Sequence, residues 1–191
     1  MAFSIHDTLN RIHELPPEAY RDLEGLFRTK HLSRNEMLLS EGDRTRHCYY
    51  LSAGVIRVFY SNDGNEYNKT FFVDGTFPTA ITALLTDSPS RLGYQALTEC
   101  ELVSFPYGEF RNLFSKHRSL ESLMLRIMEL EWIRKERHDI RMVTNDATTN
   151  YMIFREEFPG LENLIPQYHI SSYLGVTPIQ LSRIRAKLVK A

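Results

Sequence analysis

Apolar and polar positions change their spacing twice along the chain, and each change predicts a new kind of element. Residues 4–13 and 15–32 show helical spacing, with proline at a helix start. From residue 36, short apolar and aromatic runs alternate with turn residues, as strands do. These predicted strands cover residues 36–43, 47–54, 55–72, 73–77 and 92–106. Many short strands with even turn spacing favour a β-roll or barrel over a parallel sheet.

Glycine marks the predicted turns between these strands. Gly42, Gly54, Gly64 and Gly75 stand 10 to 12 residues apart. The segment 62–64, with the sequence Asn-Asp-Gly, has the composition of a tight hairpin turn. We therefore expect a hairpin between the two halves of the longest apolar run.

Helical spacing returns after Pro106. Residues 107–117 and 147–159 predict short helices, and residues 120–143 predict a long one without glycine or proline. Its apolar positions, with Arg137 interrupting them, are Leu123, Ile127, Leu130, Ile133, Ile140 and Val143. This stripe either pairs with the same helix of a second chain or packs on the barrel of its own chain. We favour the homodimer seam because one barrel edge seldom covers so long a stripe.

The last predicted elements are two helices separated by a glycine. Gly175 supplies the positive φ of a sharp turn, and Ser171 allows the two helices to cross closely. Thr177 can cap the second helix, with Pro178 at its first position and Gln180 at the capping-box position. The apolar positions that complete the pattern are Ile170, Leu174, Val176, Leu181 and Ile184. This arrangement predicts a helix-turn-helix.

The second helix of this pair has a buried face and a basic face. At 100° per residue, Leu181, Ile184 and Leu188 fall on one side, opposite the long cations. Such a face suits the DNA major groove, where Arg reads guanine, apolar atoms meet the thymine methyl and Lys reaches phosphate. The predicted DNA-binding residues are Gln167, Thr177, Ile179, Gln180, Ser182, Arg183, Lys187 and Lys190. An ordinary helical hairpin with a solvated basic face is the structural alternative.

Two neighbouring positions have other expected roles. Arg185 lies nearer the core edge, and we expect it to contact a phosphate or another helix. His169, on the first helix, could touch the DNA backbone but is more often a surface residue.

The distribution of charged residues is uneven only at the C-terminal end of the sequence. The chain has 23 basic and 24 acidic residues, which gives a formal charge of −1. Residues 166–191 carry four basic residues and no acidic one, so they are +4 while the remainder is −5. This asymmetry indicates that the C-terminal segment meets a polyanion.

Several other classes of protein are not supported. The sequence shows no signal peptide and no membrane-spanning run, so a cytoplasmic protein is expected. Cys48 and Cys100 lack metal-ligand spacing, and we interpret both as core thiols. His47 is alone in the roll, whereas a cupin metal site needs clustered histidines. No nucleophile motif is present, and we expect no enzyme activity and no cofactor.

These parts together resemble the Crp/Fnr family of bacterial transcription regulators over nearly the whole chain. The resemblance is carried by "SEGD" at 40–43, "YYLSAGVIRVFY" at 49–60, "VDGTF" at 73–77 and "LGVTPIQLSRIRAKL" at 174–188. It implies an α+β chain with an effector-sensing jelly-roll domain like the cyclic nucleotide-binding fold at 1–115, a long dimerisation helix at 116–144 and a helix-turn-helix domain at 145–191. In a two-fold dimer, the half-sites would lie about 34 Å apart.

The resemblance also predicts an altered effector pocket. Family members that bind cyclic AMP hold its ribose with a Gly-Glu pair and its phosphate with Arg followed by Ser or Thr. Here Thr79 and Ala80 align with the first pair, and Ser90 and Arg91 with the second. The ribose carboxylate is missing, and Arg91 lies one place late, which reverses its face in a strand. We therefore predict a pocket that includes Thr82 but does not take cyclic nucleotides, unless the preceding loop re-registers Arg91.

Two differences concern DNA. Many relatives continue into a two-stranded wing, whereas this sequence ends three residues after Leu188, so a wingless domain with weaker or dimer-dependent binding is expected. Pro178 and Ile179 stand where cyclic-AMP-dependent members use Arg and Glu, and only Arg183 matches their base-reading Arg.

The predicted function is a sequence-specific DNA-binding transcription regulator that acts as a homodimer on a palindromic operator. Its expected partners are double-stranded DNA, a second copy, RNA polymerase and a small-molecule effector, with no membrane. The alternative is a ligand-sensing or protein-interaction module whose helix-turn-helix no longer reads DNA. Basic faces exposed on the same side of a dimer would favour DNA, and masked faces would favour the module.

Overall fold

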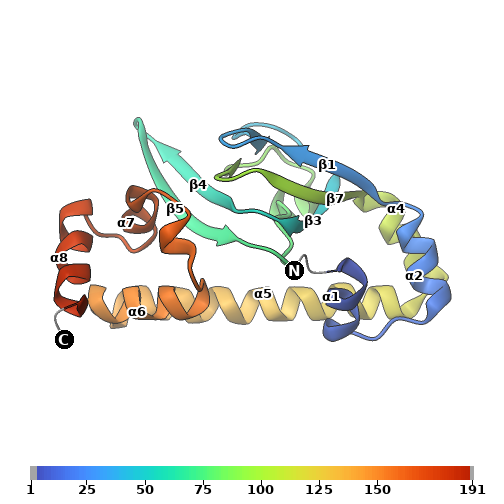
Figure 1. Ribbon diagram of the computed structural model, residues 1–191. Helices are drawn as coiled ribbons and strands as arrows, with labels where there is room; N and C mark the ends of the chain where they lie inside the picture. Colours follow the sequence, from blue (N-terminus) through green and yellow to red (C-terminus); the bar gives the residue numbers. More distant parts are fainter. Residues whose placement is uncertain (1–3, 190–191) are drawn as a thin grey trace.

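The computed structural model describes residues 4–189, which are arranged along one long helix, α5 (Figure 1). A β-roll lies on one side of α5, with α1 and α2 near one end and α7 and α8 at the other. The helices are α1 (Ile5–Ile12), α2 (Pro17–Glu24), α3 (Ile81–Thr86), α4 (Tyr107–Asn112), α5 (Arg118–Thr144), α6 (Ala147–Glu157), α7 (Gln167–Tyr173) and α8 (Pro178–Val189).

Within this described range, the strands form two antiparallel sheets. One sheet has the order β1-β7-β3, and the other has the order β2-β6-β4-β5. The strands are β1 (Arg28–Leu32), β2 (Met37–Leu39), β3 (His47–Ala53), β4 (Ile56–Asn62), β5 (Asn65–Phe72), β6 (Gly93–Ala96) and β7 (Cys100–Pro106). The α+β prediction of a β-roll, a long helix and C-terminal helices is therefore confirmed.

The predicted hairpin is present between β4 and β5. Asn62 pairs with Asn65, which leaves a two-residue loop of Asp63 and Gly64. Both loop residues have positive φ, at 49° and 78°, as a type I′ turn requires. Gly54 meets a different demand, because an added Cβ there would lie 2.5 Å from the Glu99 carbonyl oxygen.

Two predicted elements are wrong. The helix expected over 15–32 ends at Glu24, and residues Arg28–Leu32 form β1, because they pair with β7 from Arg28↔Ser104 onward. The strand expected over 73–77 is reduced to one isolated bridge, Leu51↔Thr76. In the first place a distant partner strand is present, and in the second it is almost absent. This long-range pairing, and not local preference, decides whether a strand forms.

Within residues 4–189 the hydrophobic core has three parts. One lies inside the roll, and a second joins α1, α2 and α4 to the first half of α5. The third part contains the C-terminal helices together with Val55, Phe71 and Leu97 of the roll. The C-terminal helices therefore share a core with the roll across the boundary predicted at residue 145.

Phe71 is the centre of that shared core. It is fully buried, and its ring lies 5.5 to 6.2 Å from the rings of Phe154, Phe158 and Tyr173. Aromatic pairs at such distances stabilise a core beyond their buried area. Phe71 thus packs β5 against α6 and α7.

The predicted apolar stripe of α5 divides between two environments. Leu123 is buried against the N-terminal helices, and Ile127 is partly buried with it. Leu123 therefore belongs to the intrachain core, which corrects its assignment to a dimer seam, whereas Ile127 is only partly covered there. The stripe turns away from its own chain only farther along the helix. No helix in the described range is long and apolar enough to cross a bilayer.

Candidate nucleic-acid interface and effector cleft

Helices α7 and α8 form the predicted helical pair. Gly175 between them has φ of 67°. Thr177 and Gln180 make a reciprocal capping box, in which the Thr177 N–H donates to Gln180 Oε1 at 2.9 Å and the Gln180 N–H donates to Thr177 Oγ1 at 3.2 Å. Leu181 and Ile184 are buried in the same core as Ile170 of α7. The sequence pattern thus gives both the turn and the cap.

The basic face of α8 is open to solvent. Arg183 and Lys187 are exposed, and Ile179 beside them is 66% exposed. Gln180 and Ser182 are exposed as well. Over its described length the helix carries no acidic residue. In Figure 1, α8 stands at the end of the molecule farthest from α1 and α2, beyond the roll. This face can therefore be approached by a large partner.

Three neighbouring side chains have partners within the protein. Arg185 lies 3.8 Å from a carboxylate oxygen of Glu162, which agrees with its expected contact to another element. Gln167 donates from Nε2 to the Glu162 carbonyl at 2.9 Å, and its Oε1 is buried without a partner. Thr177 uses its hydroxyl in the cap. Gln167 and Thr177 are therefore less available to DNA than predicted, and Lys190 lies outside the described residues.

His169 differs most from its expected role. The side chain is only 3% exposed, so it is neither a surface residue nor a phosphate contact. It lies instead against Arg57 and Asn68 of the roll. This inter-element network escaped the sequence reasoning, although one signal was present: Arg57 is a lone cation within the apolar run of β4.

The second half of α5 presents an apolar stripe to solvent. Leu130 and Ile133 are each 41% exposed, Ile140 is 54% exposed and Val143 is 84% exposed. Leu125, nearer the start of the helix, is exposed as well. An apolar surface of this extent on a helix is typical of an interface with another chain.

A cleft of about 700 Å³ lies between the roll and α5. The five residues predicted for the effector pocket all line it: Thr79, Ala80, Thr82, Ser90 and Arg91. The rest of the lining is mainly apolar and aromatic, and includes Phe72, Tyr94 and Trp132. A cleft of this size and composition is typical of small-molecule sites. The α5 contribution was not predicted, since helix packing on the roll creates it.

Two of the hydroxyl groups that line the cleft already have partners within the protein. Thr79 Oγ1 accepts from the Tyr49 N–H at 2.9 Å, and Ser90 Oγ donates to the Leu92 carbonyl at 2.8 Å. Ala80 provides no carboxylate. Burial raises the pKa of Tyr94 to about 12, so its phenol remains a neutral donor.

Neither the two cysteines nor any cluster of metal-binding side chains forms a further site in the described residues. Cys48 and Cys100 are buried, as predicted, and burial raises the pKa of Cys48 to about 12. Across residues 4–189, no group of His, Cys, Asp and Glu side chains is placed to hold a metal ion.

Residues 29–117 match the family model described as the cyclic nucleotide-binding domain. The match covers nearly all of the roll, and the fold around it is shared with solved structures. The resemblance seen in the sequence is thereby confirmed at the level of the fold. No curated protein sequence matches the chain.

Solved structures extend the likeness beyond the cyclic nucleotide-binding domain. The c-di-GMP responsive global regulator CLP of Xanthomonas campestris is 15% identical, with a TM-score of 0.70 and 92% of each chain covered. FixK2 of Bradyrhizobium japonicum is 16% identical, with a TM-score of 0.73, covering 86% of this chain and 85% of that one. The catabolite activator protein of Thermus thermophilus is 15% identical, with a TM-score of 0.59, covering 96% and 87%. The shared fold includes the C-terminal helices.

Proposed function

We propose that this chain is a sequence-specific DNA-binding transcription regulator of the Crp/Fnr type. The observation that carries the proposal is the open basic face of α8, where Arg183 and Lys187 are exposed above a buried Leu181 and Ile184. Exposed Arg on a recognition helix can donate two hydrogen bonds to guanine, and Lys can neutralise phosphate. The exposure of this face argues against an interaction module with masked helices.

A homodimer is the second part of the proposal. The exposed stripe of α5 has no cover within the described chain, and it follows the helix toward the C-terminal helices. Pairing of two such stripes would bury apolar surface and relate two α8 helices by a two-fold axis. A palindromic operator then follows from the symmetry of the protein.

The cleft is proposed to take a small-molecule effector other than cyclic AMP. Its apolar lining and the absence of a carboxylate at Ala80 leave the ribose hydroxyls without an acceptor at that position. A ligand whose polar group is buried without a hydrogen-bond partner binds much more weakly. A ligand with more apolar surface fits these walls better.

The proposed function is tested by selecting bound sequences from random duplex DNA and titrating them against Arg183→Ala. We expect the substitution to weaken binding to the selected operator by about 1–3 kcal/mol and to relax preference at one base position in each half-site. Fluorescence anisotropy gives the affinity, and repeated selection gives the base preference. Cyclic AMP in the titration is expected to leave both unchanged.

Arg185→Ala is the matched control, because it removes one cation from the same helix. Arg185 lies beside Glu162, away from the face that carries Arg183 and Lys187, so base preference should survive its loss. If wild-type protein selects no sequence, the regulator proposal fails. If both Arg variants weaken all sequences equally, Arg183 contributes charge alone and does not read bases.

A further inference from the structure

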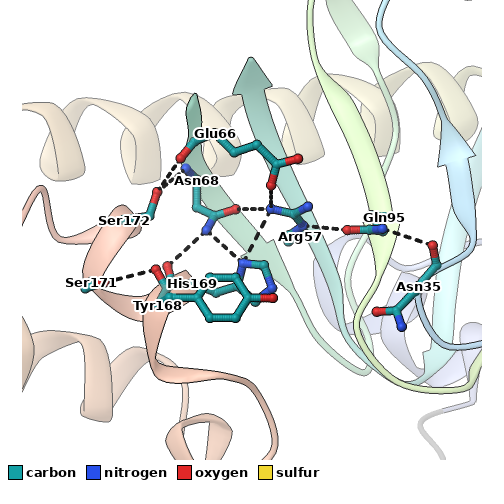
Figure 2. Close-up of polar contacts among 9 residues, drawn as sticks. All are labelled: Asn35, Arg57, Glu66, Asn68, Gln95, Tyr168, His169, Ser171 and Ser172. Atoms are coloured by element: carbon teal, nitrogen blue, oxygen red, sulfur yellow. Dashed lines mark hydrogen bonds and ion pairs between the residues drawn. The ribbon is translucent and has the colours of Figure 1, made fainter. Parts of the chain in front are cut away.

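A buried polar network connects the roll to the first helix of the DNA-binding pair (Figure 2). Arg57 of β4 is its centre, with a side chain only 6% exposed. Its Nη1 donates to Glu66 Oε2 at 2.6 Å and lies 3.4 Å from both Asn68 Oδ1 and His169 Nδ1. Its Nε donates to Gln95 Oε1 at 2.8 Å. A buried guanidinium with this many partners has one defined position.

His169 completes the network as a hydrogen-bond acceptor. Asn68 Nδ2 donates to His169 Nδ1 at 3.2 Å and to the His169 carbonyl at 3.0 Å. Because Arg57 and Asn68 both present donors to the same ring nitrogen, the imidazole is neutral and carries its proton on Nε2. The asparagine therefore holds both the side chain and the backbone of α7.

Ser172 makes a second connection one turn farther along α7. Its hydroxyl accepts from the backbone N–H of Asn68 at 2.9 Å and donates to the backbone carbonyl of Glu66 at 3.0 Å. These are backbone groups of β5, so the helix extends the hydrogen bonding of the strand. Figure 2 shows both atoms of β5 meeting the same hydroxyl.

Tyr173 attaches α7 to α5. Tyr173 Oη lies 3.2 Å from His138 Nδ1, and the two rings stack with centroids 5.0 Å apart. The same tyrosine packs on Phe71. From α7 the connection continues to α8 through the shared core and through the Val176 N–H, which donates to the Ser171 carbonyl at 3.0 Å. An unbroken series of packed contacts thus runs from the roll to the recognition helix.

We propose that Arg57, Asn68 and Ser172 are positioning residues for DNA recognition, acting through α7 to fix where α8 stands relative to the roll and the dimer helix. This inference rests on the proposed function. None of the three needs to touch DNA, because the contact that each makes is with α7 or with a residue that holds it.

The docked arrangement is the one that would meet DNA. The basic face of α8 is already exposed while α7 is docked, so no undocking is needed to uncover it. Undocking would expose Phe71 and would remove the His169 acceptor from Arg57 and Asn68, and both changes are costly. The roll therefore fixes the position of α7 and α8 in each chain, and with it the separation of the two recognition helices in the dimer.

The experiment compares Ser172→Ala with Ser171→Ala. These adjacent residues receive the same small change, but Ser171 Oγ donates only to the Tyr168 carbonyl within α7 and does not reach β5. Each variant is titrated with the selected operator and with versions whose half-site spacing is changed by one or two base pairs. Wild type and Ser171→Ala should discriminate strongly against altered spacing.

We expect Ser172→Ala to bind the native spacing about tenfold more weakly, which corresponds to the loss of two hydrogen bonds of ordinary strength. Its discrimination between spacings should shrink, while binding to nonspecific DNA stays unchanged. A merely structural weakening would not alter spacing preference. Equal affinity and equal spacing preference for both serine variants would overturn the proposal.

A DNA-free measurement separates this proposal from the proposed function. Spin labels at Glu101→Cys and Ala186→Cys report the distance between the roll and α8, and excess unlabelled protein isolates the intrachain distance. The two natural cysteines are buried and stay unlabelled. A broader distance distribution in Ser172→Ala than in Ser171→Ala supports positioning even if no operator is found. Identical widths contradict it.

Discussion

His169 shows how the fold changes the chemistry of a single residue. Burial, and then the neighbouring Arg57 guanidinium, lower the pKa of His169 to about 4, while Glu66 opposes them. An unfolded histidine titrates near 6.5. At neutral pH the ring is therefore uncharged in either state, and it keeps its acceptor role in the network. A protonated ring would instead place a second cation against Arg57.

The first consequence is a pH dependence of stability. Between pH 6.5 and 4 the unfolded chain binds a proton at His169 that the folded chain does not, so stability falls as the pH falls through this window. The shift from 6.5 to about 4 corresponds to about 3 kcal/mol. Urea unfolding at several pH values measures the slope.

His169→Asn provides the comparison for this slope. Its amide oxygen can still accept a hydrogen bond near the position of Nδ1, but the residue does not titrate. The variant should lose part of the decline below pH 6.5. Parallel curves for wild type and variant would show that His169 does not contribute. The burial behind this behaviour could not be predicted from the sequence, where a histidine next to Tyr168 is consistent with an exposed face.

Helix α5 illustrates the same limit at the scale of an element. Its spacing of apolar residues correctly predicts a long amphipathic helix, and the structure extends it from Arg118 to Thr144. The spacing alone does not say which molecule covers each part of the stripe. Leu123 packs within the chain, whereas Ile133 and Ile140 face solvent. Which part of the stripe is buried within the chain depends on where the N-terminal helices pack against α5.

Ile133→Glu is predicted to break the homodimer. A charge in an apolar helix seam must be desolvated without a partner, which shifts the equilibrium toward monomer by at least tenfold in dissociation constant. Sedimentation equilibrium or light scattering over a concentration series measures this shift. The operator affinity should fall with dimer content, since one half-site supplies fewer phosphate contacts.

Glu131→Ala on the same helix is the control, because this exposed residue lies about 200° around the helix from Ile133, away from the stripe, and should leave the association unchanged. A chain that is monomeric before any substitution would remove the seam from the proposal. A dimer that tolerates Ile133→Glu would place the interface elsewhere.

At the scale of the whole molecule, the roll and the C-terminal helices share buried side chains. Phe71 belongs to a strand of the roll, yet its ring neighbours lie on the C-terminal helices. Arg141 of α5 and Glu157 of α6 add an ion pair at 2.7 Å, and Arg134 lies over the Phe158 ring. We therefore expect the roll and the C-terminal helices to unfold together.

Phe71→Ala tests this coupling. Removing a fully buried phenylalanine should lower the free energy of unfolding by about 3–5 kcal/mol. Hydrogen exchange should accelerate in α7 and α8 as well as in β5, because their common core is opened. Native-state exchange followed by mass spectrometry locates the effect.

Phe110→Ala is the matched substitution at the other end of the molecule. This phenylalanine is equally buried but packs with the N-terminal helices. It should cost similar stability without selectively loosening α7 and α8. Exchange that accelerates only in β5 after Phe71→Ala would show that the C-terminal helices have an independent core.

The sequence by itself determined what depends on neighbours along the chain. Turn chemistry at 62–64, the capping box at Thr177 and Gln180, and the basic face of α8 all involve residues within one or two turns of each other. Backbone sterics and helical spacing act at that range, so local pattern was sufficient. The family resemblance rests on the order of these same local signals.

Only the tertiary structure decided what depends on residues far apart. The β1–β7 pairing, the cleft against α5 and the contacts of Arg57 with His169 join segments separated by up to 112 positions. Many registers and docking arrangements are compatible with the same local pattern. The selection among them comes from simultaneous packing of side chains such as Phe71, because burial is a property of the whole assembly.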